Sequence, residues 1–184
     1  MKVNFRSLPA VISKNELARL TNKNDTELKI SVNNWVKVGS LKKAGPRSGI
    51  YYNLVNDPDW KNHIAEAVLK KYPSAILAGP TVLHAFGCQT QIPSKMWVII
   101  LKARTNVEMD GVEFMPRPLR WYAKNKPEQQ LFGLPSLSPK QALDDGEKHK
   151  NIPGSWVPDM DDIDIDEVHE TSSFPLPPTK KKVF

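Results

Sequence analysis

The chain has 184 residues, of which 40% are hydrophobic, and its 26 Lys/Arg against 20 Asp/Glu give a formal net charge of +6. This length suits one medium domain or two small ones, and the single cysteine excludes a disulfide framework and a multi-cysteine zinc site. No signal peptide is recognisable at the N-terminus, and no apolar run approaches the roughly 18 residues that a membrane span needs. We therefore expect a cytoplasmic protein that does not bind a membrane.

The charge is unevenly distributed along the chain. Residues 1–56 carry ten Lys/Arg against three Asp/Glu, a net charge of +7, whereas residues 151–184 carry three Lys against seven Asp/Glu, a net charge of −4. A basic N-terminal part predicts a polyanionic partner there. The alternative is an ordinary solvated cationic surface.

The first predicted helix covers residues 14–21. Ser13 and Glu16 match the capping-box pattern, a hydroxyl followed three residues later by Glu. Residues 22–24 are predicted as a turn, and Asp25 is expected to cap a second helix, where it places negative charge at the positive helix end. A short helix, a turn and a longer helix form a helix-turn-helix arrangement.

The second helix is expected to stop at Gly39 and to bury an apolar stripe at helical spacing, made by Leu28, Val32, Trp35 and Val36. After it, two strand-like runs, 40–43 and 50–53, flank a turn-forming cluster at 45–49. A helix with a polar outer face joined to a basic hairpin is the plan of a winged helix. We therefore predict a winged helix-turn-helix DNA-binding domain over residues 1–56.

Seven side chains of this domain are predicted to contact DNA. Asn33 and Asn34 are the candidate base readers, because an amide can pair bidentately with adenine. The cationic side chains are expected to contact phosphates: Lys29, Lys37, Lys42, Lys43 and Arg47. The alternative for each of the seven is an ordinary solvent-exposed polar group.

A second domain is predicted over residues 57–150. Asp57 and Pro58 indicate a helix start, and the helix that they open is expected to reach Lys71 and to connect the two domains. The remainder is predicted as a small α+β or α/β domain with these elements: a buried segment at 75–79, a helix at 80–86, strands at 96–101, 112–115 and 119–122, and a helix opened by Ser138 and Pro139. The whole chain is thus expected to be α+β.

Residues 151–184 are predicted to form a flexible, acidic, Pro-rich tail that only solvates the protein. The alternative is an interaction segment in which residues 159–170 dock on a partner or on the basic N-terminal part.

The sequence holds few residues that indicate catalysis. It has neither a phosphate-binding loop nor a nucleophile elbow, and its histidines lack the spacing of metal ligands. Cys88 is expected to be a small buried apolar residue. Asp144, Asp145 and Glu147 could suggest a metal-dependent nuclease, but they fall at a predicted helix end rather than on a strand. We therefore predict no enzymatic activity, no metal and no cofactor, and keep a nuclease as the weakest alternative.

Three stretches, in this order and spacing, resemble the AbiEi-type antitoxins. The first is LPAVISKNELARL followed by NNWVKVGSLKKAGPRSGIYY, the second is YPSAILAGPTVLHAFGCQTQIPSKMWVIIL, and the third is LPSLSPKQALDD. Together they cover roughly residues 8–148. In the longer members of that family a helical region follows the third stretch, whereas this chain continues with the Pro-rich acidic tail.

The resemblance implies a role rather than a reaction. Antitoxins of this type belong to type IV toxin–antitoxin (abortive infection) systems and are paired with a nucleotidyltransferase-like toxin, which they counteract without a stable complex. They repress their own operon by binding inverted repeats in double-stranded DNA. We therefore expect a DNA-binding autorepressor. The alternatives are a stand-alone regulator on a mobile element without a toxin partner, and a protein-interaction module.

Overall fold

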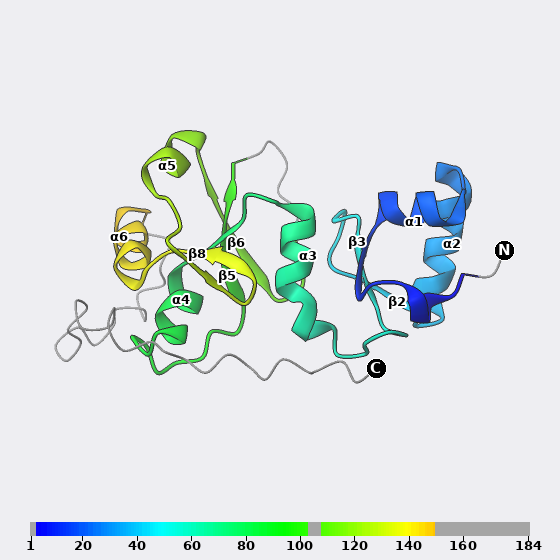
Figure 1. Ribbon diagram of the computed structural model, residues 1–184, viewed down its shortest axis with the longest axis horizontal. Coiled ribbons are helices and arrows are strands. Elements are labelled where there is room, and N and C mark those ends of the chain that lie inside the picture. Colours follow the sequence, from blue (N-terminus) through cyan, green and yellow to red (C-terminus); the bar gives the residue numbers. More distant parts are fainter. Residues whose placement is uncertain (1–2, 103–107, 150–184) are drawn as a thin grey trace, which may run out of the picture.

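A computed structural model describes residues 3–102 and 108–149. Within them the fold is α+β, as predicted, with six α-helices and two β-sheets. Figure 1 shows an elongated molecule in which helix α3 (Ile64–Lys71) separates a small N-terminal unit from a larger second unit. The predicted tail, residues 151–184, lies outside the described residues.

The N-terminal unit packs two helices against a three-stranded antiparallel sheet of order β1-β3-β2. After a 3-10 turn at Phe5–Ser7, its elements are β1 (Val11–Ser13), α1 (Lys14–Thr21), α2 (Asp25–Lys37), β2 (Leu41–Lys43) and β3 (Ile50–Asn53). These bounds confirm the predicted helix at 14–21 and, within one residue, the two predicted hairpin strands.

Both helices begin with a capping box. The Ser13 hydroxyl accepts from the Glu16 amide at 3.2 Å, as predicted, and Glu16 accepts from the Ser13 amide at 2.7 Å. The prediction that Asp25 caps α2 was wrong by one residue. Asn24 has the extended backbone of a cap and accepts from the Glu27 amide at 3.0 Å, whereas Asp25 is the first helical residue and binds Lys14 at 2.8 Å.

The N-terminal sheet is apolar on both faces, because β1 and β3 carry apolar residues at successive positions and successive side chains of a strand point to opposite faces. One face, with Ile12 and Leu41, packs on Leu17, Leu28 and Val32 of α1 and α2. The other face belongs to the core of the second unit and contains Val11, Ile50 and Tyr52, together with Ala67 and Val68 of α3. The two units therefore share one continuous core through α3.

The connection between the units differs from the predicted single helix. A 3-10 turn at Trp60–His63 precedes α3, so the helix does not start at Asp57. The Asp57 carboxylate instead accepts from the Asp59 amide and contacts the His63 ring, each at 2.9 Å. These local contacts hold residues 57–63 in turns.

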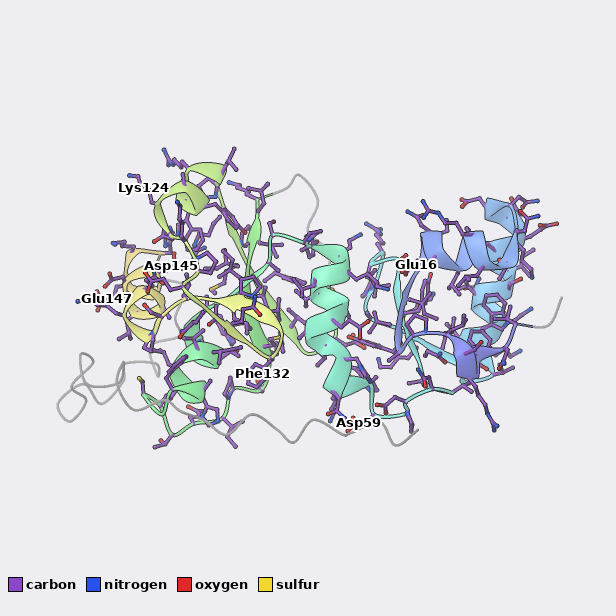
Figure 2. The ribbon with its side chains drawn as sticks, viewed as in Figure 1. Glu16, Asp59, Lys124, Phe132, Asp145 and Glu147 are labelled. Carbon is purple, nitrogen blue, oxygen red and sulfur yellow. The ribbon has the colours of Figure 1, made fainter. Side chains whose placement is uncertain are left out.

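Lys70 of α3 ties the second unit to the first. Its ammonium donates to Glu16 at 2.9 Å and to the Val11 carbonyl at 3.0 Å, and Figure 2 labels Glu16 on the side of α1 that faces α3. Partial burial raises the pKa of Glu16, but hydrogen bonds from Ser13 and Lys70 outweigh it and hold that pKa below its ordinary value. Glu16 is therefore charged at neutral pH, as the ion pair requires.

The second unit is a five-stranded mixed sheet of order β6-β5-β4-β8-β7, in which β5–β6 and β4–β8 are parallel pairs. Its strands are β4 (Ile76–Leu77), β5 (Met96–Leu101), β6 (Val112–Arg117), β7 (Gln129–Leu131) and β8 (Leu134–Ser136). Its helices are α4 (Gly79–Ala85), α5 (Leu119–Lys124) and α6 (Pro139–His149). The predicted strand at 96–101 and the helix opened by Ser138 are confirmed.

The strand predicted at 119–122 was wrong, because these residues form helix α5. Pro118 precedes its first turn with an extended backbone (φ −71°, ψ 158°), and the Trp121 indole donates to Asp145 of α6 at 2.7 Å. This tertiary contact outweighs the strand preference of Trp and Tyr. The β7–β8 hairpin was not predicted; its turn places Phe132 and Gly133 at φ 53° and 79°.

Candidate nucleic-acid interface

Helix α2 presents an uncovered face opposite its buried stripe. Leu28 and Val32 are buried, with Trp35 and Val36 partly buried against the same core, as predicted. Residues three and four apart are neighbours on a helix, so most of the solvent-exposed positions of α2 form two adjacent rows. The first, which we call the lysine row, is Lys29, Asn33 and Lys37. The second, the isoleucine row, is Thr26, Ile30 and Asn34, continued by Val38, the residue that caps the C-terminal end of α2.

This face lies at the outer end of the molecule. Figure 1 shows α2 beyond the N-terminal sheet, on the side away from α3 and the second unit. Ile30 and Val38 keep 59% and 71% of their surface exposed. The face is therefore open to a large partner.

Most of the cationic side chains predicted to contact phosphates are uncompensated. Among the described residues, no ion pair engages Lys29, Lys37, Lys43 or Arg47. The carboxylate of Asp25, by contrast, is paired with Lys14, and this hydrogen bond raises the pKa of Lys14. Four of the five side chains that are predicted to contact phosphates thus remain available to an anionic ligand.

Lys42 does not join the other predicted residues. Its ammonium forms an ion pair with Asp110 of the second unit and lies 4.4 Å from the centre of the Trp60 ring. Strand alternation explains this position, since Leu41 points to α2 and Lys42 therefore points to the opposite face of the sheet. In the structure Lys42 thus makes a contact between the hairpin and the second unit, and its phosphate role stays a prediction.

The β2–β3 hairpin also packs on the second unit through its backbone. The Asp110 amide donates to the Ala44 carbonyl at 2.7 Å, and Gly45 is buried against the backbone of Glu108 and Met109. Lys43 and Arg47 stay exposed, and Arg47 has a left-handed backbone with φ 57°. The hairpin is thus held to the second unit at the start of its loop, while Lys43 at the end of β2 and Arg47 in the loop face solvent.

Sequence reasoning missed Ile30 and Thr26 as candidate contact residues. The available signal was their position, since neither falls on the apolar stripe that begins at Leu28. An isoleucine outside such a stripe points to solvent or to a partner, and its exposure in the fold shows that no other described part of the chain covers it.

The residues weighed for catalysis are not assembled into a site. Asp145 is buried in an ion pair with Arg117, while Asp144 and Glu147 are exposed on α6. No group of three or more potential metal ligands occurs in the described part of the chain. Cys88 is buried, and burial raises the pKa of its thiol. These positions give no support to the nuclease alternative.

Between residues 3 and 149, leaving out 103–107, no helix has the length and apolarity that crossing a membrane would require.

Comparisons with known proteins bear on the fold. No protein-family model and no curated protein sequence matches the chain. The structure is similar to the crystal structure of the RV2827C protein from Mycobacterium tuberculosis, with a TM-score of 0.51, 18% sequence identity and 76% of this chain covered. The chain covers 55% of that protein's length. At this identity the likeness shows a shared fold alone.

Proposed function

We propose that this protein is a sequence-specific DNA-binding transcriptional regulator whose N-terminal unit is a winged helix-turn-helix. Support comes from the element order β1-α1-α2-β2-β3, with two capped helices and an antiparallel hairpin that follows the second helix. The observation that carries the proposal is the exposed face of α2, which combines free lysines with amide side chains at the outer end of the molecule.

The proposed roles follow the chemistry of these side chains. Lys29 and Lys37 on α2, with Lys43 and Arg47 on the hairpin, neutralise phosphates. Asn33 and Asn34 are the candidates for hydrogen bonds to base edges in the major groove. Lys42 is left out, because Asp110 already holds its ammonium. The activity is binding, so no catalytic group, metal or cofactor is assigned.

The resemblance to AbiEi-type antitoxins supports a narrower proposal, that the protein is an autorepressor of a type IV toxin–antitoxin operon. It would bind inverted repeats as two copies, because one α2 helix reads only one half-site. A nucleotidyltransferase-like toxin would be its functional partner without a stable complex. A gene for such a toxin beside its own would favour this version over a stand-alone regulator.

The first test is binding to the DNA upstream of its own gene, measured by fluorescence anisotropy against a scrambled sequence at two salt concentrations. We expect preference for the upstream DNA and an affinity that falls steeply with salt, because each neutralised phosphate adds about 0.9 to the slope of log K against log salt. The double variant Lys29→Ala/Lys37→Ala should bind all sequences more weakly, with a slope smaller by about two.

The matched control is Lys124→Ala/Lys140→Ala, which removes two exposed lysines from α5 and α6 at the other end of the molecule and should leave affinity and slope unchanged. A flat salt response, or equal affinity for upstream and scrambled DNA, contradicts the proposal. The N-terminal unit would then be a docking surface for another protein.

A further inference from the structure

The exposed face of α2 has an apolar centre. Successive residues of a helix turn by about 100°, so Ile30 lies about 200° from the buried Leu28, almost diametrically opposite the core. It is 59% exposed, and its neighbours in the isoleucine row are two small polar side chains, Thr26 and Asn34. A β-branched side chain there contributes nothing to the core of α2 and is stiff at χ1.

The lysine row lies to one side of Ile30. Lys29, Asn33 and Lys37 follow one another along the helix, and the two lysines have the length and flexibility to reach groove walls. On the other side of the isoleucine row lies Glu27, whose carboxylate is exposed apart from a hydrogen bond from the Asn24 amide at 3.3 Å. The two flanks of the isoleucine row therefore differ in charge, and only the lysine flank is attracted to phosphates, so only this flank can lie close to a phosphate wall.

A helix with its side chains is about 10–12 Å wide, and the major groove of B-form DNA is about 12 Å wide. A helix in this groove therefore presents one row to the base edges at the floor and its flanks to the phosphate walls. Apolar side chains recognise the C5-methyl group of thymine there, and an amide recognises adenine.

We propose that α2 enters the major groove with the isoleucine row on the floor and the lysine row on one phosphate wall, so that Ile30 packs against a thymine methyl group. Asn34, four residues further along the same row, pairs with a neighbouring adenine, while Asn33 lies between the lysines near the backbone. This inference rests on the proposed function. It adds the kind of DNA sequence that α2 recognises, one centred on A·T base pairs.

The test compares upstream DNA made with thymine against the same fragment made by replacing every thymine with uracil, which removes the methyl group and keeps the base-pairing groups. We expect the wild-type protein to bind the uracil fragment more weakly, by roughly fourfold for each methyl group that it buries. Ile30→Ala should bind the thymine fragment more weakly and should show a thymine-to-uracil affinity ratio near one.

The matched control is Ile92→Ala, the same substitution at an isoleucine that is 76% exposed in the second unit; it should keep the wild-type ratio. Circular dichroism checks that both variants are folded, which the exposure of both side chains favours. Equal affinity of the wild type for the two fragments, or an unchanged ratio in Ile30→Ala, overturns the inference while selective binding still upholds the proposed function. Failure to prefer the upstream DNA at all overturns both.

Discussion

Replacing Asp145 with alanine is expected to lower the free energy of unfolding by about 3–5 kcal/mol, because removing one partner of a buried ion pair leaves a charge inside the protein. The Arg117 and Asp145 side chains are 3% and 4% exposed, and Nη2 of the arginine lies 2.6 Å from Oδ2 of the aspartate. Both carboxylate oxygens also accept from Nε at 3.2 Å. Figure 2 labels Asp145 on α6, on the side that faces the sheet.

The same carboxylate holds two further groups in place. It accepts from the Trp121 indole at 2.7 Å, which links α5 to α6, and its Oδ1 lies 3.1 Å from Nδ1 of His149. Loss of Asp145 therefore removes contacts of β6, α5 and α6 at once.

Urea denaturation measures this effect, and Asp144→Ala is the control. Asp144 is the preceding residue of α6 but is exposed, so its loss should change stability by no more than about 0.5 kcal/mol. The apolar pair Arg117→Met/Asp145→Leu should recover part of the lost stability, since a buried ion pair can often be replaced by packed apolar residues. The recovery is incomplete because the Trp121 indole N–H loses its acceptor. A loss below about 1 kcal/mol in Asp145→Ala would show that water reaches the Arg117 charge.

Replacing Gly45 with alanine is expected to detach the hairpin from the second unit. A Cβ atom at this position would lie 2.1 Å from the Glu108 carbonyl oxygen and 2.7 Å from the Met109 Cα. Both are backbone atoms, so the clash cannot be relieved by a side-chain rotation. The hairpin must move, with a loss of stability of about 1–3 kcal/mol as for other overpacked sites.

Hydrogen exchange at the Asp110 amide reports the detachment directly, because that amide donates to the Ala44 carbonyl in the intact contact. We expect its protection to fall in Gly45→Ala. The contact between Lys42 and Asp110 should weaken as well. DNA affinity should fall, because Arg47, a proposed phosphate contact, lies two residues further along the same loop and would be displaced.

Gly49→Ala is the control that distinguishes the effect of a steric clash from the effect of backbone strain. Gly49 has a φ of +68° with nothing within 4 Å of an added Cβ, so alanine there costs about 1 kcal/mol of backbone strain without a clash. The protection of the Asp110 amide against hydrogen exchange should then stay near the wild-type value. If both variants lose it equally, the close approach of Gly45 to the second unit is not what holds the hairpin.

Local patterns in the sequence determined much of the secondary structure. The capping boxes at Ser13–Glu16 and Ser138–Gln141 were predicted and are both formed. The apolar stripe of α2, the hairpin strands and β5 were also predicted correctly. Each of these signals acts over fewer than about ten residues, through hydrogen bonds or helical periodicity, so it can be recognised without the rest of the chain.

The candidate interface on α2 was predictable for the same reason. The buried stripe from Leu28 to Val36 implies an opposite face, and the exposure of Lys29, Asn33, Asn34 and Lys37 agrees with it. The pattern did not draw attention to Ile30, because an isoleucine in an amphipathic helix is normally counted with the core.

The tertiary structure alone decided the features that the sequence did not predict correctly, through contacts between residues far apart in the sequence. Residues 119–122 form a helix rather than a strand where Trp121 binds Asp145. Lys42 is held by Asp110, 68 positions away, and Gly45 is buried by the backbone of Glu108 and Met109. The consecutive apolar residues of β1 and β3 show that both faces of the N-terminal sheet are apolar, but not what covers them. What covers the face away from α1 and α2 is decided only by the packing of α3 and the second unit. This packing depends on the apolar area that distant segments bury together, which no short stretch of the sequence reveals.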